Sequence, residues 1–185
     1  MNNTLRINDL QPTDAKALGH LMVSVYSHLP GFPTWKEQPA YYRMLENIAD
    51  FADKPGTRVL TAHLPDNRLV GGVVYFGNMS HYGSGGMATT LTDTSGIRLL
   101  GIDPDHRGVG AGKALTLACL NLARAQEHTQ VVLHTTRAMQ TAWQMYERLG
   151  FQRWDALDFL QQGFPVYGFR LMLNSPMSVP GQAQS

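Results

Sequence analysis

The sequence predicts an α/β protein of the α+β type, with a mixed, mostly antiparallel central sheet of about seven strands flanked by about four helices. Three observations support this prediction. Apolar residues recur at helical spacing in the first fifty residues, and from residue 57 the period changes to that of strands. Turn residues then separate two strand-like segments, which favours an antiparallel hairpin. Further along, a strand, a helix and a strand follow in order, which is typical of a parallel crossover.

The N-terminal part of the chain predicts one strand and two helices. Residues 4–8 form the expected strand, and a helix begins at Pro12 with apolar residues at helical spacing. The segment 31–35 places a glycine and a proline within three residues, which predicts a loop. A second helix follows Pro39 and carries one apolar side as far as Phe51.

The middle of the chain predicts the first part of the sheet. Residues 58–63 and 69–76 predict two antiparallel strands, joined by the turn Pro65-Asp-Asn67. A polar, glycine-rich insert without clear period covers residues 77–96, and loops of this length are usually functional or mobile. Residues 97–102 predict the next strand, which Asp-Pro ends.

A crossover unit follows. A helix runs from the glycine cluster to about Gln126 with a wide apolar surface, which predicts burial against a sheet. Residues 131–135 predict a strand parallel to residues 97–102. The next helix covers about residues 139–149 and ends at Gly150.

Two further strands, residues 151–159 and 166–173, are expected to close the sheet as a hairpin. The prediction is therefore one domain over residues 1–173. Residues 174–185 are polar and rich in small residues, so we expect a flexible C-terminal tail there.

Charge and composition exclude several classes of function. Fifteen Lys and Arg residues face fourteen Asp and Glu residues, and only 16% of the chain is charged. Nucleic acids and anionic membranes need clustered positive charge, so we expect neither as a partner. The single cysteine, Cys119, excludes an internal disulfide and predicts a buried structural thiol. The histidines form no pair at metal-ligand spacing, so no metal is expected.

The start of the chain has no apolar stretch typical of a signal peptide, and no run approaches the roughly 18 apolar residues of a membrane helix. We therefore expect a cytoplasmic protein.

Glycine is concentrated in one region: eleven of the 18 glycines lie between Gly71 and Gly112. The segment Arg107-Gly-Val-Gly-Ala-Gly-Lys113 lies between a predicted strand and a predicted helix. N–H groups at a helix start have no intrahelical acceptor, and glycines let a phosphate approach them closely. The segment fits neither a Walker loop nor the dinucleotide pattern. It matches Arg-x-x-Gly-x-Gly, and by itself it indicates either an anion site or a tight turn.

Two blocks of sequence together carry a resemblance. Leu99-Leu-Gly-Ile-Asp-Pro-Asp-His-Arg-Gly-Val-Gly-Ala-Gly-Lys113 is followed about 30 residues later by Ala142-x-x-x-Tyr146-Glu-Arg-Leu-Gly-Phe151. In order and spacing these blocks resemble the GCN5-related N-acetyltransferase (GNAT) family. The resemblance covers nearly the whole chain. It implies the acyl-CoA N-acyltransferase (GNAT) fold, with acetyl-CoA as the acetyl donor.

The resemblance also implies where the donor binds. The pyrophosphate of acetyl-CoA would lie on the amides from Gly108 to Lys113, and the pantetheine arm would pair like an extra strand where two parallel strands splay. A side chain at Gly101 is expected to crowd that arm. Met139 stands where many family members carry an asparagine, and it cannot supply the same polar contact. The expected donor-binding residues are Leu100, Gly101, Ile102, Arg107, Gly108, Val109, Gly110, Ala111, Gly112 and Lys113.

The chemistry expected from the resemblance is direct attack of an amine on acetyl-CoA in a ternary complex. Tyr146 would be the general acid that protonates the CoA thiolate, because a phenol with a pKa of about 10 stays protonated at pH 7. Without the surrounding motif, Tyr146 is more typical of a helix face buried in a core. A backbone amide between Leu100 and Ile102 would hold the oxyanion. The general base is left open between Asp93, His81 and a chain of waters.

In this family the acceptor pocket is built by the loop between the first two helices, the insert before the fourth strand and the last hairpin. These segments offer Phe32, Trp35, Tyr41, His81, Tyr82, Phe164 and Tyr167. They are aromatic and contain no acidic cluster that would suit a polyamine, so we expect a small-molecule amine or an amino-acid-like acceptor. The same aromatic residues would also suit a core or a contact between two copies, which leaves a homodimer open.

Two other functions stay open at this point. One is a non-catalytic acyl-CoA-binding sensor module, and the other is an acyltransferase that uses a longer acyl-CoA.

Overall fold

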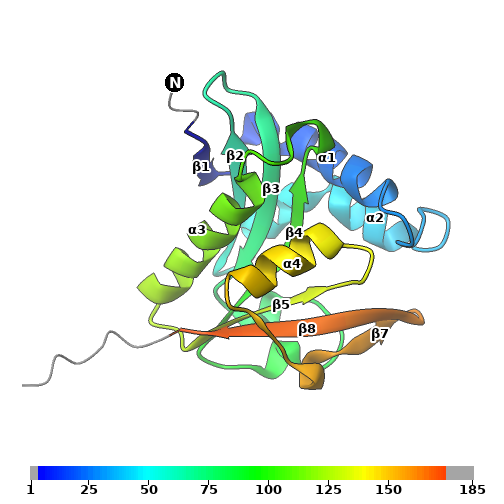
Figure 1. Cartoon of the computed structure of the whole chain (residues 1–185), viewed down its shortest axis with the longest axis vertical. Helices are drawn as coiled ribbons and strands as arrows, with labels where there is room; N and C mark the ends of the chain where they lie inside the picture. Colours follow the sequence, from blue (N-terminus) through cyan, green and yellow to red (C-terminus); the bar gives the residue numbers. More distant parts are fainter. Residues whose placement is uncertain (1–3, 174–185) are drawn as a thin grey trace, which may run out of the picture.

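In the computed structural model, which describes residues 4–173, eight strands form one mixed sheet (Figure 1). The strand order is β1-β2-β3-β4-β5-β8-β6, and β7 pairs with β8. The pair β4–β5 is parallel and the other pairs are antiparallel. The strands are β1 (Arg6–Asp9), β2 (Thr57–His63), β3 (Leu69–Phe76), β4 (Thr94–Ile102), β5 (Gln130–Thr135), β6 (Gln152–Arg153), β7 (Phe159–Gln161) and β8 (Phe164–Met172). The predicted fold class is confirmed.

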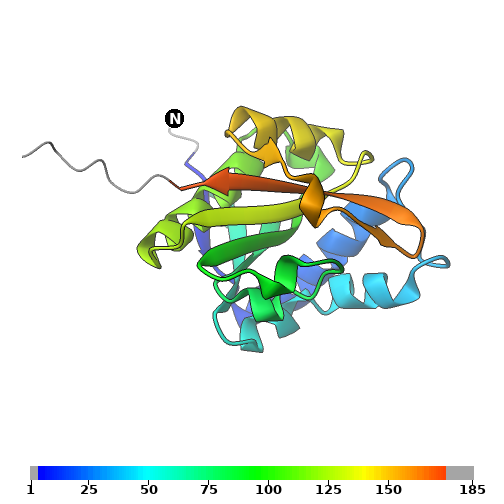
Figure 2. The ribbon, with the colours of Figure 1, turned by 90° about the horizontal axis from the view of Figure 1, so that it is seen from below.

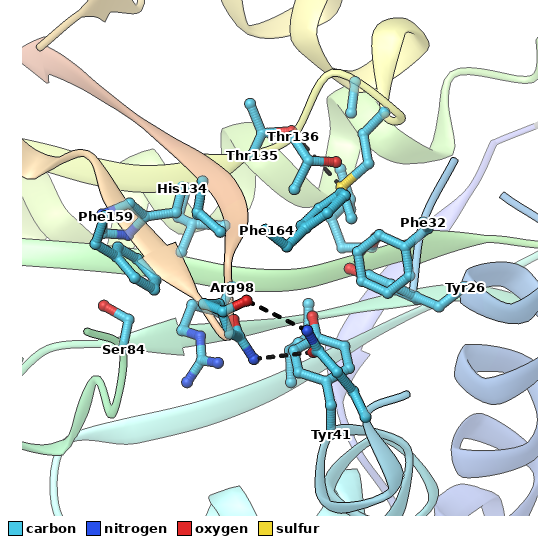
Figure 3. Close-up of a pocket in the computed structure, with 18 of the residues that line it drawn as sticks. Tyr26, Phe32, Tyr41, Ser84, Arg98, His134, Thr135, Thr136, Phe159 and Phe164 are labelled. Atoms are coloured by element: carbon cyan, nitrogen blue, oxygen red, sulfur yellow. Dashed lines mark hydrogen bonds between the residues drawn. The ribbon is translucent and has the colours of Figure 1, made fainter. Parts of the chain in front are cut away.

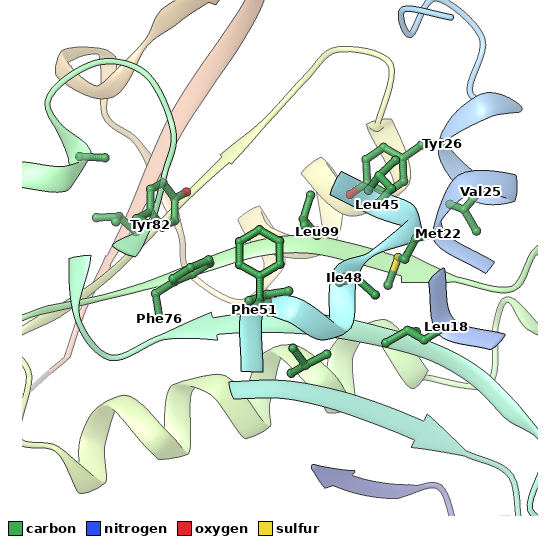
Figure 4. Packing of buried hydrophobic residues seen from close by; sticks show 14 of the residues in the cluster. Leu18, Met22, Val25, Tyr26, Leu45, Ile48, Phe51, Phe76, Tyr82 and Leu99 are labelled. Atoms are coloured by element: carbon green, nitrogen blue, oxygen red, sulfur yellow. The ribbon is translucent and has the colours of Figure 1, made fainter. Parts of the chain in front are cut away.

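Helices cover both faces of the sheet (Figure 2). The α-helices are α1 (Ala15–Ser27), α2 (Pro39–Glu46), α3 (Ala111–Ala125) and α4 (Gln140–Arg148). Short 3-10 helices occupy Pro12–Asp14, Ile48–Asp53, Met79–His81, Ala88–Thr90, Pro104–His106 and Asp155–Leu157. The helices α1 and α2 pack on one face around Leu18, Met22 and Phe76 (Figure 4). The helices α3 and α4 pack on the other face, around Leu115 and the buried thiol of Cys119.

Three local differences from the sequence prediction have identifiable causes. The second helix ends at Glu46, because the Asn47 side chain donates to the Arg43 carbonyl and a 3-10 segment follows. The insert before β4 is anchored to the core by the fully buried Tyr82. The last hairpin is interrupted between β6 and β7, where Leu157 packs so closely on Gly168 that a β-carbon there would lie 2.3 Å from that of Leu157.

The most consequential irregularity is a bulge in β4. The ladder to β5 stops at the pair Ile97–Leu133, whereas the ladder to β3 continues to Ile102. Along β3, the single residue Val73 faces both Leu99 and Leu100. The extra residue, Leu99, has a left-handed φ of 58°, which costs a non-glycine residue roughly 1–2 kcal/mol. Beyond the bulge β4 has no partner on its β5 side, which is the splay that the resemblance implied.

The bulge also switches the face to which side chains point. Side chains two residues apart in a regular strand share a face. Here Ile97 belongs to the core under α3 and α4, whereas Leu99 belongs to the core under α1 and α2. Arg98 and Leu99 therefore both reach the side of the sheet that α1 and α2 cover.

No helix within residues 4–173 is both long and apolar enough to cross a membrane. The expected tail, residues 174–185, lies outside the described residues.

Candidate active site

A pocket of about 700 Å³, counting its open mouth, lies beside the bulge (Figure 3). Its walls come from β4, β5 and α4, from α1 and α2 with their connecting loop, and from the hairpin β7–β8. The pocket is therefore located where β4 and β5 part.

Tyr146 reaches this pocket from α4. The residue is 4% exposed, and its ring packs edge-on against Phe151 with the ring centroids 5.6 Å apart. Burial raises the pKa of the Tyr146 hydroxyl well above its usual 10, so the group stays protonated. Among the described residues the hydroxyl has no hydrogen-bond partner. The hydroxyl is therefore available for a hydrogen bond to a molecule bound in the pocket.

Thr136 contributes a second unpaired hydroxyl. The residue is 4% exposed, lines the pocket just after β5, and its Oγ1 has no hydrogen-bond partner within the described part of the chain. The neighbouring Thr135 hydroxyl donates weakly to the sulfur of Met139, at 3.6 Å. A buried hydroxyl without a partner is unfavourable, so a polar ligand group at this wall would be stabilised. Thr136 was not among the residues expected from the sequence, although it directly follows the second parallel strand.

His134 also faces the pocket, but its imidazole is held neutral. Burial lowers its pKa to about 4. Its Nε2 lies 2.8 Å from the Leu157 carbonyl and donates to it, so its Nδ1 accepts from the Tyr82 hydroxyl at 2.9 Å. Both nitrogens are occupied, and His134 cannot readily take a proton from an amine.

An aromatic cluster forms the opposite wall. Phe32 lies at the centre, with ring-centroid distances of 5.4 Å to Tyr26 and 5.7 Å to both Tyr41 and Phe164. The Tyr26 hydroxyl donates to the Leu100 carbonyl at 3.1 Å, which joins this wall to the bulge. The wall offers flat apolar surface to an acceptor.

The glycine segment forms a separate feature at the start of α3. Gly108 and Gly110 have φ values of 82° and 84°, and a β-carbon at either position would point into open space. The amides from Gly108 to Lys113 donate no hydrogen bond within residues 4–173. The side chains of Arg107 and Lys113 are exposed and belong to none of the ion pairs found in that part of the chain. Free amides, a helix start and two cations are the chemistry that a diphosphate requires.

In β4, before this segment, two of the three residues expected to contact the pantetheine arm of acetyl-CoA turn their amides toward the unpaired side of the strand. Asp103 donates to the Val70 carbonyl of β3, and alternate residues of a strand point their amides to the same side. Gly101 is therefore turned toward β3, whereas Leu100 and Ile102 are turned toward the unpaired side.

Gly101 was expected to lack a side chain so that the pantetheine arm could approach, but the structure shows a different cause. A β-carbon there would lie 2.4 Å from the Met22 sulfur of α1. Packing of α1 on the sheet, and not a bound ligand, requires this glycine.

Of the seven expected acceptor residues, three line the pocket and four do not; Phe32 and Tyr41 are among those that do. Trp35 is 42% exposed and packs on Tyr42, because it lies on the outer side of the loop before α2. Tyr82 is fully buried and its hydroxyl is committed to His134. His81 lies in the 3-10 segment beside it, outside the pocket. From the last hairpin, Phe164 lines the pocket and Tyr167 does not.

Neither candidate for the general base lies in the pocket. Asp93 is exposed before β4, and its carbonyl accepts from the Thr129 amide. His81 is outside the pocket, as described above. No Asp or Glu within residues 4–173 lines the pocket, and no three His, Cys, Asp or Glu residues are grouped there to hold a metal ion.

Comparisons with known proteins agree with this fold and site. The model of the acetyltransferase (GNAT) family matches residues 22–151. A mycothiol acetyltransferase from Arthrobacter sp. strain FB24 is 32% identical over 133 residues, which are 72% of this chain and 38% of that protein. Another from Thermobispora bispora is 45% identical over 58 residues, 31% of this chain and 20% of that protein. This chain thus matches between a fifth and two fifths of the length of these two relatives.

Solved structures show the same fold. A GNAT-family acetyltransferase from Staphylococcus aureus Mu50 has a TM-score of 0.70 at 16% identity and covers 92% of this chain and 100% of its own. A structure from Salmonella typhimurium, described as an acetyltransferase with its cofactor acetyl-CoA, has a TM-score of 0.65 at 15% identity, with coverages of 95% and 98%. The PaiA N-acetyltransferase from Thermoplasma acidophilum, in complex with coenzyme A, has a TM-score of 0.66 at 14% identity, with coverages of 89% and 98%.

The fold and the matched family model define the class of GNAT acetyltransferases. The chain belongs to the GNAT acetyltransferase family.

Proposed function

We propose that this protein transfers the acetyl group of acetyl-CoA to the amine of a small-molecule or amino-acid-like acceptor. The observation that carries the proposal is the unpartnered, protonated hydroxyl of Tyr146 in a pocket at the point where β4 and β5 part. The acceptor nitrogen would attack the thioester carbon, so that a C–N bond forms as the C–S bond breaks. Tyr146 would give its proton to the departing thiolate.

Binding of acetyl-CoA would use the unpaired amides of two backbone segments. The amides from Gly108 to Lys113, with Arg107 and Lys113 beside them, would hold the diphosphate. The free edge of β4 at Leu100 and Ile102 would pair with the pantetheine arm, and an amide of this edge would hold the oxyanion.

The acceptor must lose a proton, and the pocket offers no carboxylate to take it. His134, with a pKa of about 4, is also too weak a base. An amine with a pKa near 10.4 is neutral in about 4 of 10,000 molecules at pH 7. We therefore propose that the proton leaves to water at the mouth of the pocket.

The mycothiol acetyltransferases among the relatives support a small-molecule acceptor, since mycothiol is the molecule that their name gives. The test of the function is a panel of primary amines with acetyl-CoA, in which release of the CoA thiol is followed. We expect acetyl-CoA at 100 times its Kd to stabilise the protein by about 2.7 kcal/mol, and at least one amine to release thiol. Stabilisation without transfer to any amine would favour the sensor function, and faster reaction with butyryl-CoA would favour a longer acyl donor.

Replacing Thr136 by valine is expected to weaken acetyl-CoA binding about fivefold to tenfold, because its unpaired hydroxyl would donate to the pantetheine arm in place of the asparagine that Met139 replaces. The free energy of unfolding of the unliganded protein should not fall by more than about 0.5 kcal/mol, since no hydrogen bond is lost. Calorimetry and chemical unfolding measure the two effects.

Thr57 offers a matched control for Thr136. Its Oγ1 is likewise buried without a partner, and the residue lies at the start of β2, outside the pocket. Thr57→Val should leave the Kd for acetyl-CoA unchanged. An unchanged Kd in Thr136→Val as well would remove Thr136 from the donor site.

A further inference from the structure

Arg98 gives the pocket its charge. Among the lining residues in the described part of the chain it is the one with a permanent charge, and no carboxylate lines the pocket with it. It belongs to none of the ion pairs within residues 4–173. Figure 3 shows its guanidinium group between Ser84 and Tyr41 in this view.

The contacts of Arg98 leave most of its donors free. One nitrogen, Nη1, donates to the Tyr82 carbonyl at 2.7 Å, and the guanidinium carbon lies 5.6 Å from the centre of the Tyr82 ring. A guanidinium group carries five N–H donors. The remaining strong donors have no oxygen acceptor within the described residues, and the sulfur of Met44 lies 4.0 Å from Nη2.

The position of this arginine is unfavourable for the unliganded protein. The side chain is partly buried, and removing a cation from water without a counter-charge costs free energy. A planar carboxylate matches the guanidinium fork with two parallel hydrogen bonds and recovers that cost. An anion bound in the pocket beside Arg98 would therefore be stabilised.

We infer that the acceptor carries a carboxylate, which Arg98 binds, and that it is an apolar amino acid whose side chain packs on the aromatic wall. This inference rests on the proposed function and narrows its acceptor. Phe32, Tyr41 and Phe164 supply the apolar surface for such a side chain. The absence of acidic lining residues within residues 4–173 argues against an acceptor with a second amine.

The test compares each apolar amino acid with its amide, which keeps the amine and the side chain and loses the negative charge. The probes are phenylalanine and leucine with phenylalaninamide and leucinamide, and thiol release from acetyl-CoA is followed. For wild type we expect kcat/KM to be about 10- to 100-fold higher for the acids, the range of one charge-assisted bidentate contact. This comparison in wild type needs no variant to fold.

Two variants then assign the preference to Arg98. Arg98→Gln should lose the preference through a higher KM for the acids, with little change in kcat/KM for the amides. Arg98→Lys should recover part of the preference for the acids, because lysine keeps the positive charge but lacks the planar guanidinium group. Stabilisation by acetyl-CoA, measured on each variant, verifies that the donor site is intact.

The outcomes separate the inference from the function on which it rests. Equal or better transfer to the amides in wild type overturns the carboxylate inference and leaves the proposed N-acetyl transfer intact. A preference for the acids that survives in Arg98→Gln also overturns it. Binding of acetyl-CoA with no transfer to any of these four probes overturns the inference, and no transfer to any amine of the wider panel overturns the proposed function as well.

Discussion

Replacing Tyr146 by phenylalanine is expected to lower the rate of acetyl transfer by about 10²-fold or more, while the Kd for acetyl-CoA stays within about twofold. The substitution removes one oxygen that has no partner among the described residues, so packing against Phe151 is kept. What is lost is the proton for the departing thiolate. Single-turnover kinetics and calorimetry measure the two quantities.

Tyr167→Phe is the matched control for this substitution. The Tyr167 hydroxyl accepts from Arg137 at 3.3 Å and lies outside the pocket, so its loss should leave the transfer rate unchanged. In wild type, the raised pKa of Tyr146 means that ionisation of this phenol should not reduce the rate below about pH 10. An unchanged rate in Tyr146→Phe would exclude this tyrosine as the acid.

Replacing Gly110 by aspartate is expected to weaken acetyl-CoA binding by about 10²-fold, equivalent to about 2.8 kcal/mol. The new carboxylate would repel a diphosphate held on the surrounding amides, and it would occupy the open space in front of them. The fold should tolerate the change. Aspartate is one of the residues that adopt a left-handed φ, and an acidic residue at a helix start interacts favourably with the dipole.

A second donor distinguishes repulsion from general damage. S-acetylpantetheine lacks the diphosphate, so its kcat/KM should be nearly the same in Gly110→Asp and wild type. Gly163→Asp is the control for backbone strain, because Gly163 has nearly the same φ of 82° and equally open surroundings in the β7–β8 turn. It should leave acetyl-CoA binding unchanged. An equal loss with both donors would mean that Gly110 supports the fold and not a diphosphate site.

The features that the sequence predicted well depend on local chemistry. The start of α3 is an example, because the glycines, the two cations and the helix pattern lie within a few residues of one another. The hairpin β2–β3 is another, since its turn and its two apolar runs are contiguous. The parallel pair β4–β5 followed from the order of a strand, a helix and a strand along the chain.

The position of Leu99 in the pocket depends on the bulge and could not be predicted from the sequence. A regular alternation through β4 places Ile97 and Leu99 on one face, and the left-handed Leu99 separates them. The direction of the side chains from Leu99 onward depends on the left-handed φ of Leu99. The sequence does not predict this angle, since leucine rarely adopts it. Leu99 was not expected in the pocket for this reason, whereas Arg98 faces the side of α1 and α2 with or without the bulge.

Side-chain direction explains why several of the expected acceptor residues lie outside the pocket. Trp35, His81 and Tyr82 do come from the expected segments, but a segment presents only part of its residues to a cavity. Tyr82 turns inward because its ring fills the core and its hydroxyl donates a hydrogen bond to Nδ1 of His134. Such choices depend on residues 52 positions away in the sequence.

The short ladder between β4 and β5 has a mechanical consequence. Within residues 4–173, the ladder between β4 and β5 has four residue pairs, from Thr94–Gln130 to Ile97–Leu133, and just before it the Asp93 carbonyl accepts from the Thr129 amide. Past the pair Ile97–Leu133 the two halves of the sheet are open like a wedge. The pantetheine arm of acetyl-CoA, bound along the free edge of β4, would lie between the two halves. It would then serve as an additional strand of the sheet for as long as the complex lasts. Cohesion between the halves would then rise and fall with every catalytic cycle.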